Sequence, residues 1–151
     1  MQKKLILILI FFLSSNLNAQ EKENFLMLKN NIVNVRYGPS FEYPIKFIYK
    51  KKNLPIKIID QKDNFRRIVD HKHNSGWIHT SQLKKSSSVI LTENQIIFSK
   101  PTKFSKPVAV AEKGKLILIK KCKENWCKTS DKEISGWILF QNYWGELPIK
   151  N

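Results

Sequence analysis

The sequence is poor in the residues on which hydrolytic chemistry depends. It has 12 acidic residues and three histidines among 151 residues. A glycosidase needs two carboxylates in one cleft, and the scattered acidic residues show no spacing that pairs them. A serine hydrolase needs a Gly-x-Ser-x-Gly elbow, and none occurs. We therefore expect a protein that is not an enzyme and that uses no cofactor.

The chain also lacks an apolar run long enough to cross a bilayer. Residues 5–13 read LILILIFFL, whereas a transmembrane helix needs about 20 apolar residues. Lys3 and Lys4 precede this run and the small Ala19 follows it, which is the pattern of a secretory signal peptide. We predict that residues 1–19 are a signal peptide, with an uncleaved anchor as the alternative. The mature protein is then expected in the periplasm or cell envelope, and no cysteine follows the run to indicate a lipid anchor.

Cysteine is nearly absent, and both cysteines lie in the part expected to be exported. An even number of cysteines outside the cytosol usually forms disulfides. Cys122 and Cys127 are separated by four residues, so in a hairpin they face each other at about 4.5–5.5 Å between Cα atoms, within disulfide range. We predict this disulfide, which also removes the thiolate that a cysteine peptidase needs. The alternative is a zinc site, for which tighter ligand spacing is usual, completed by His71, His73 or His79.

Acidic residues are outnumbered by lysines. Arginine occurs only at Arg36, Arg66 and Arg67, and the other 24 of the 27 basic residues are lysines. Without residues 1–19 the net charge is +13, which attracts polyanions and anionic membrane surfaces. Abundant isoleucine and asparagine accompany the lysines, and an A- and T-rich genome produces the same bias. Both explanations of the charge remain open.

Two copies of one unit fill the rest of the chain. The tetrapeptide SGWI occurs at 75–78 and again at 135–138, and an acidic-Asn-aromatic triplet occurs at 63–65 and 124–126. The spacing is about sixty residues. We predict a first unit at 24–84, a polar linker at 85–88 and a second unit at 89–148.

Each unit reads as short strands rich in Val, Ile, Phe and Trp, with no helical periodicity. The sequence thus predicts an all-β protein with two small barrels, which leave few unpaired strand edges. The strands are expected at 25–28, 32–36, 47–49, 54–60, 65–70 and 77–79, and at 89–91, 96–98, 108–111, 116–121, 126–130 and 137–140.

The order of these motifs resembles the bacterial SH3-like domain, here as the tandem pair found in exported proteins. The resemblance rests on Asn-Val-Arg-x-Gly-Pro-Ser at 34–40, Tyr-Pro at 43–44, Leu-Pro-Ile at 54–56, Asp-Asn-Phe-Arg-Arg-Ile at 63–68 and Gly-Trp at 76–77 and 136–137. Two departures are Phe65, where the family often has Trp, and the second opening at 97–101, which lacks the Arg and the Gly. The family implies envelope proteins, often modules that target peptidoglycan enzymes to the wall.

The stretch NVRYGPSFEYP at 34–44 is the predicted binding site. Gly38 and Pro39 are expected to turn the chain, while the aromatic side chains line a groove that accepts extended peptides, such as peptidoglycan stem peptides. Arg36 or the nearby Lys46 is expected to pair with their carboxylates. The alternative is structural: Arg36 pairs with an acidic residue of its own domain and Phe41 plugs the barrel end. The expected ligand-binding residues are Arg36, Tyr37, Phe41 and Tyr43.

The remaining predictions concern structure and partners. Gly76 and Gly136 are expected to let Trp77 and Trp137 turn onto each barrel, mainly as packing residues. The partner is predicted to be peptidoglycan or another wall component. The alternatives are electrostatic binding of anionic polymers or lipid, and an adaptor role toward an envelope protein; specific binding of nucleic acid and a metal are not expected.

Overall fold

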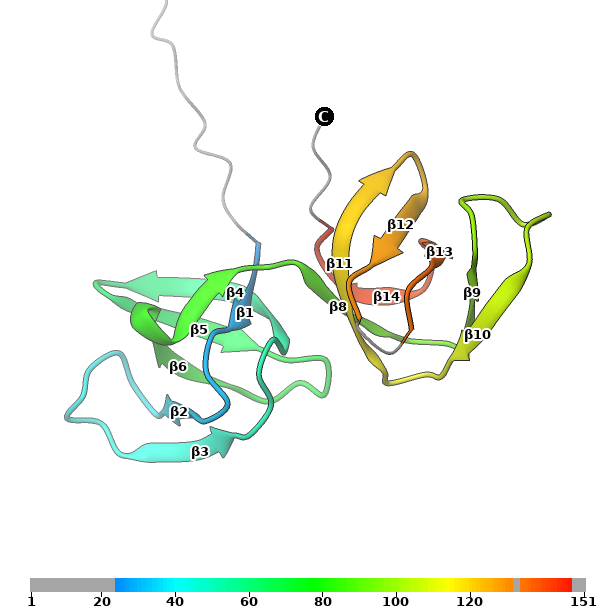
Figure 1. Ribbon diagram of the computed structural model, residues 1–151. Helices are drawn as coiled ribbons and strands as arrows, with labels where there is room; N and C mark the ends of the chain where they lie inside the picture. The colour runs from blue at the N-terminus through cyan, green and yellow to red at the C-terminus, as the bar shows by residue number, and fades with distance from the viewer. Residues whose placement is uncertain (1–23, 132–133, 148–151) are drawn as a thin grey trace, which may run out of the picture.

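The described part of the chain, residues 24–131 and 134–147, forms two all-β barrels in a computed structural model (Figure 1). The first barrel consists of β1 (Phe25–Leu28), β2 (Val33–Arg36), β3 (Ile45–Tyr49), β4 (Pro55–Lys62), β5 (Phe65–Val69), β6 (Ser75–His79) and β7 (Leu83–Lys85). The second consists of β8 (Ser88–Leu91), β9 (Gln95–Phe98), β10 (Pro107–Ala111), β11 (Leu116–Lys123), β12 (Trp126–Thr129), β13 (Trp137–Leu139) and β14 (Tyr143–Gly145).

The two barrels repeat one topology. The strand order is β3-β2-β6-β5-β4-β1-β7 in the first and β10-β9-β13-β12-β11-β8-β14 in the second, so each strand has a counterpart seven strands later. All strand pairings are antiparallel. The prediction of two tandem SH3-like barrels is confirmed. The sequence missed β7 and β14, the three-residue strands that extend each sheet beyond β1 and β8.

No α-helix occurs among the described residues, which contain one short 3-10 turn at Thr80–Gln82. Within the same residues, no helix has the length and apolar character needed to cross a membrane. The predicted signal peptide, residues 1–19, lies outside the part of the chain that the structure describes.

Alternating side chains build each core. In β2 the side chains of Val33 and Val35 are fully buried, while Asn34 and Arg36 between them are partly exposed. Tight turns join the strands where a residue takes a positive φ, as at Asp63 in the β4–β5 hairpin and Glu124 in the β11–β12 hairpin. Acidic and amide side chains tolerate this conformation better than branched ones do. This explains Asp63, the first residue of the triplet in the first repeat.

The glycine of each SGWI is required by a close approach of two strands. A Cβ at Gly76 would lie 2.4 Å from Val35 Cγ1, and one at Gly136 would lie 2.4 Å from Ile97 Cγ2. Each glycine thus lets the neighbouring strand, β2 or β9, pass directly over it. The following residues, Trp77 and Trp137, are half-buried.

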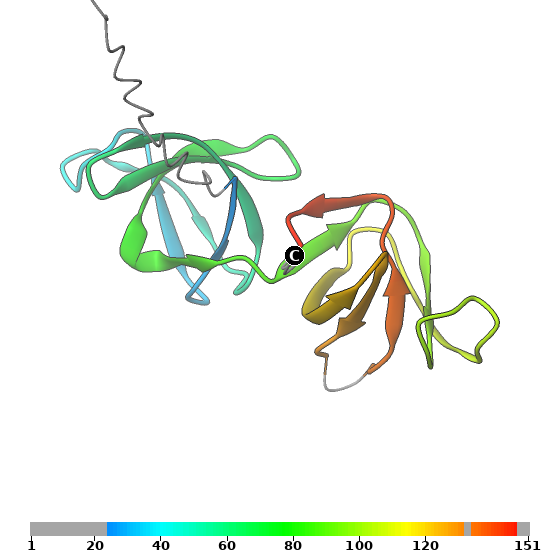
Figure 2. The same ribbon diagram turned by 90° about the horizontal axis from the view of Figure 1, so that it is seen from above.

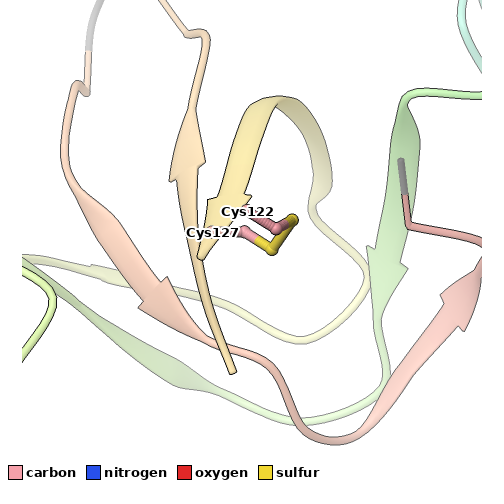
Figure 3. Close-up of a disulfide and its surroundings, with 2 residues drawn as sticks. All are labelled: Cys122 and Cys127. Carbon is pink, nitrogen blue, oxygen red and sulfur yellow. A yellow bond between two sulfur atoms is a disulfide. The ribbon is translucent and has the colours of Figure 1, made fainter. Parts of the chain in front are cut away.

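Cys122 and Cys127 are joined by a disulfide, as predicted (Figure 3). The two residues face each other across β11 and β12, with 4.0 Å between their Cα atoms. The hairpin is tighter than the sequence suggested: Lys123 still pairs with Trp126, so the loop itself has two residues. Cys127 is fully buried in the second core. The zinc alternative required both sulfurs as thiolates, which the disulfide removes.

The barrels share part of one core. Ile90 of β8 is 2% exposed and belongs to the hydrophobic cluster of the first barrel, and Trp144 of β14 packs against the same cluster. The Trp144 indole meets the Phe25 ring edge to face at 5.4 Å between centroids. Inside the predicted linker, Ser86 is buried, and Ser88, at the start of β8, donates a hydrogen bond to the Asn53 carbonyl at 2.6 Å. The segment between the barrels is thus folded into their contact.

Candidate functional site

The loop at 37–44, between β2 and β3, is tied down by the arginine that precedes it. Arg36 Nη1 donates hydrogen bonds to the carbonyl oxygens of Tyr43 at 2.7 Å and Phe41 at 3.1 Å. The loop is closed by the Tyr37 amide, which donates to the Pro44 carbonyl at 3.2 Å. Arg36 therefore holds the loop through backbone carbonyls, whereas the structural alternative expected an acidic partner. These bonds use one of its guanidinium nitrogens, and the group carries five N–H donors in all.

The three aromatic side chains of the loop are held in distinct ways. Tyr43 lies over Gly38, where a Cβ would come within 2.6 Å of the ring, so the glycine leaves the space that the ring occupies. Phe41 rests on Phe65 and His79, with ring centroids 5.2 Å and 5.0 Å away. Tyr43 is thus positioned by a contact within the loop, and Phe41 by contacts with β5 and β6.

Tyr37 stands beside a lysine of β3. Its ring lies 5.6 Å from Lys46 Nζ, which donates a hydrogen bond to the Ser75 carbonyl at 2.9 Å. On the other side of the loop, the Arg36 guanidinium carbon lies 5.4 Å from the centroid of Phe41. Each cation therefore stands beside an aromatic ring within the distance for a cation–π contact.

The structure thus brings together the four predicted ligand-binding residues and Lys46, the other cation that the sequence suggested. We call the resulting surface the aromatic loop face; its members are Arg36, Tyr37, Phe41, Tyr43 and Lys46. The three aromatic side chains remain 61%, 62% and 47% exposed in that order, although large apolar groups are usually buried. Sequence reasoning did not foresee that Phe65 and His79 support this face, because they come from β5 and β6.

A buried carboxylate lies elsewhere in the first barrel, next to the β5–β6 turn. Asp70 is 2% exposed and accepts hydrogen bonds at 2.9 Å from the Tyr49 hydroxyl, the Lys72 amide, the Asn74 amide and Asn74 Nδ2. Burial opposes its ionisation, but these bonds outweigh burial and hold the pKa of Asp70 below its usual value. Burial, aided by Asp70, raises the pKa of Tyr49, and burial lowers the pKa of His71. The hydrogen bonds of the Asp70 carboxylate thus close the β5–β6 turn.

Among the residues of the second barrel that the structure describes, no loop repeats the aromatic loop face. Its β9–β10 loop is closed by the Ser99 amide and the Lys106 carbonyl, as the first loop is closed by Tyr37 and Pro44. When the two loops are aligned on these closing hydrogen bonds, Phe98 lies opposite Arg36 and Lys103 lies opposite Phe41. The second opening therefore lacks the arginine and the phenylalanine of the first.

Among the hollows of the second barrel, two lie at positions that aligned aromatic residues occupy in the first barrel. One, of about 320 Å³, lies beside Phe98, Lys103 and Leu139, at the place that Phe41 covers in the first barrel. The other, of about 150 Å³, is lined in part by Ala111 and Asp131, where the pairing register aligns Ala111 with Tyr49. The two copies therefore differ in that Lys103 and Ala111 of the second barrel replace the aromatic side chains of the first.

Comparison with known proteins agrees with this architecture. The family model described as Bacterial SH3 domain matches residues 29–85 and 92–145. The chain belongs to the bacterial SH3 domain family. Both copies of this SH3 domain lie within the matched residues, and bacterial SH3 domains commonly bind components of the cell wall. Together with the disulfide, membership fits an extracellular or envelope protein.

Among solved structures, the bacterial SH3 pair is similar to NlpC2 and NlpC1 from Trichomonas vaginalis. Identity is 12% and 13%, the TM-scores are 0.37 and 0.36, and 82% and 83% of this chain is covered. The chain spans about half the length of these two proteins, 48% and 46%. No curated protein sequence matches the chain.

Proposed function

We propose that this protein is a non-catalytic module of the cell envelope that binds peptidoglycan through the aromatic loop face of its first barrel. The observation that carries the proposal is the exposure of Tyr37, Phe41 and Tyr43 on a loop whose backbone Arg36 fixes. Exposed apolar side chains gathered at one place mark interaction sites. A fixed loop also loses little conformational entropy on binding, which favours affinity.

The chemistry of the face suits an extended, negatively charged ligand. Aromatic rings offer flat apolar surfaces to an extended chain, and Arg36 and Lys46 beside them offer positive charge. Peptidoglycan stem peptides are extended and carry carboxylates, which form strong charge-assisted hydrogen bonds with such cations. Because the rings supply part of the contact, binding should weaken modestly with salt rather than steeply, as it does for polyanions.

The test combines sedimentation with purified peptidoglycan and thermal melting of the same variants. Tyr37→Ala is the most informative change, because the side chain of Tyr37 is 61% exposed and its ring stands beside Lys46. We expect it to weaken binding about tenfold while barely changing the melting temperature. Arg36→Ala should lower both, because it releases the loop.

Phe104→Ala in the second barrel is the matched control, since it also removes an exposed aromatic ring and should leave peptidoglycan binding unchanged. If Tyr37→Ala and Tyr43→Ala bind as the native protein does, the aromatic loop face is not the site.

The proposal also excludes wall hydrolysis by this chain. It is supported by the disulfide, which removes both thiolates, and by the engagement of Asp70 in four hydrogen bonds. Peptidoglycan incubated with the protein should release no soluble fragments. Release that persists in Cys122→Ser and Asp70→Asn would contradict the proposal and place the activity elsewhere in the chain.

Export is part of the same proposal. A disulfide persists in oxidising compartments outside the cytosol, and Cys122–Cys127 is formed. The intact mass of the protein recovered from its native envelope should correspond to a chain that begins at Gln20. A species that retains residues 1–19 would show that the segment is an anchor.

A further inference from the structure

The tip of the β9–β10 hairpin presents a phenylalanine to solvent. Phe104 is 100% exposed, more than any other large hydrophobic residue that the structure describes. Its loop is not loose: the Ser105 hydroxyl donates to the Lys100 carbonyl at 3.0 Å, and the Phe104 amide donates to Thr102 Oγ1 at 3.3 Å. A hydrogen-bonded loop therefore holds an apolar ring in water, which is unfavourable unless the ring meets a partner.

The apolar surface continues down the hairpin from Phe104. Ile96 and Val110 face each other across β9 and β10 and are 47% and 61% exposed. Val108, between them and the loop, is 51% exposed. β10 is the edge strand of its sheet. We call these side chains, Ile96, Phe104, Val108 and Val110, the apolar hairpin face.

Positive charge surrounds the same tip. Lys100, Lys103 and Lys106 lie in the loop, and residues 95–111 contain no aspartate or glutamate. Acidic residues return at Glu93 and Glu112, at the opposite end of the hairpin. The tip of the hairpin is therefore cationic, whereas at its base Glu93 and Glu112 are accompanied by Lys113 and Lys115. An apolar ring among lysines is the composition with which proteins enter the interface of an anionic bilayer.

The first barrel shows that the fold does not impose this arrangement. Its β2–β3 loop is closed by the same hydrogen bond, between Tyr37 and Pro44. By the same alignment, Glu42 takes the place of Phe104, and the neighbouring Phe41 lies on Phe65 and His79. The exposed ring and the missing acidic residue are thus features of the second copy.

We propose that the β9–β10 hairpin docks on an anionic phospholipid membrane, with Phe104 inserted at the level of the headgroups and the loop lysines bound to phosphate. Figures 1 and 2 show this hairpin at the end of the second barrel that is farthest from the first barrel, while the β2–β3 loop projects at the opposite end. The membrane site is therefore separate from the aromatic loop face, and the inference does not depend on peptidoglycan binding.

The experiment is sedimentation with vesicles of phosphatidylcholine, with and without phosphatidylglycerol, using a chain that begins at Gln20 so that the apolar residues 5–13 do not contribute. We expect binding only with phosphatidylglycerol. Phe104→Ala should weaken it about tenfold, and each of Lys100→Ser, Lys103→Ser and Lys106→Ser about fivefold. Tyr37→Ala is the control and should bind vesicles as the native protein does.

A soluble polyanion, heparin, separates insertion from charge alone. The lysine variants should lose binding to heparin and to vesicles alike, whereas Phe104→Ala should lose binding to vesicles only. In Phe104→Trp, lipids brominated near the headgroup should quench the added fluorescence. Equal vesicle binding by Phe104→Ala and the native protein, an unquenched Phe104→Trp, or equal binding to neutral vesicles would each overturn the proposal.

Discussion

Removing the Asp70 carboxylate should destabilise the first barrel strongly and in a pH-dependent way. Asp70 is 2% exposed and receives four hydrogen bonds, one of them from the half-buried Tyr49 hydroxyl. Asp70→Ala leaves that hydroxyl without an acceptor, at a cost of about 1–3 kcal/mol. The amides of Lys72 and Asn74 lie in an exposed turn and regain water, so the loss of their bonds adds about 1 kcal/mol.

We therefore expect the free energy of unfolding to fall by about 3 kcal/mol at pH 7. At about 4 °C per kcal/mol for a unit of this size, the melting temperature should fall by about 12 °C. Asp70→Asn should be nearly as harmful, because its amide would place a donor among donors. Asp60→Asn is the matched control: its exposed carboxylate accepts one bond, from the amide of Gln61, and its loss should change the melting temperature by less than about 2 °C.

The pH dependence distinguishes a charged acceptor from simple packing. The pKa of Asp70 is lowered in the folded state from its ordinary value of 3.8. The carboxylate therefore contributes stability that is fully present above about pH 4 and is lost as the pH falls through the lower folded pKa. Thermal melts between pH 7 and pH 2 should show the native protein losing its advantage over Asp70→Asn only at the acidic end. An advantage that is constant with pH would refute this account.

Three further predictions concern stability. Cys122→Ser should lower the free energy of unfolding by about 2 kcal/mol, since so small a loop gains little from closure, and thiol titration of the native protein should find no free thiol. Gly76→Ala should lower the free energy of unfolding by about 1–3 kcal/mol, because it forces a Cβ against Val35. An unchanged denaturation midpoint would show that β2 can shift to make room for the Cβ. Trp144→Ala removes the ring that meets Phe25 and packs on the first core; it should replace a single calorimetric transition by two.

The sequence alone predicted those features that depend on neighbouring residues. Alternation placed Val33 and Val35 in one strand, and the acidic-Asn pairs marked both hairpin turns. The disulfide could be predicted because Cys122 and Cys127 flank one of these turns. β7 and β14 were missed because Lys84, Lys85 and Gly145 are residue types that are depleted in strands.

The rest depends on contacts between distant residues. Ile90 and Trp144 are apolar residues that either barrel could bury, and only the tertiary structure assigns them to the first core. The four residues predicted for the binding site lie within eight positions of one another, so a local pattern found them. Their support by His79 and the stacking of Tyr37 with Lys46 arise from the pairing of β2, β3 and β6.

The burial of Ile90 in the first barrel has a mechanical consequence. β7 ends at Lys85 and β8 begins at Ser88, so only two residues join the last strand of the first barrel to the second barrel, and the third residue of β8 already lies in the first core. The chain between the barrels therefore has no slack. A force that pulls the two barrels apart finds no flexible linker to extend. It must first withdraw Ile90 from the first core and separate Phe25 from Trp144. Two structures bound at opposite ends of this protein would therefore be held at a fixed distance from each other.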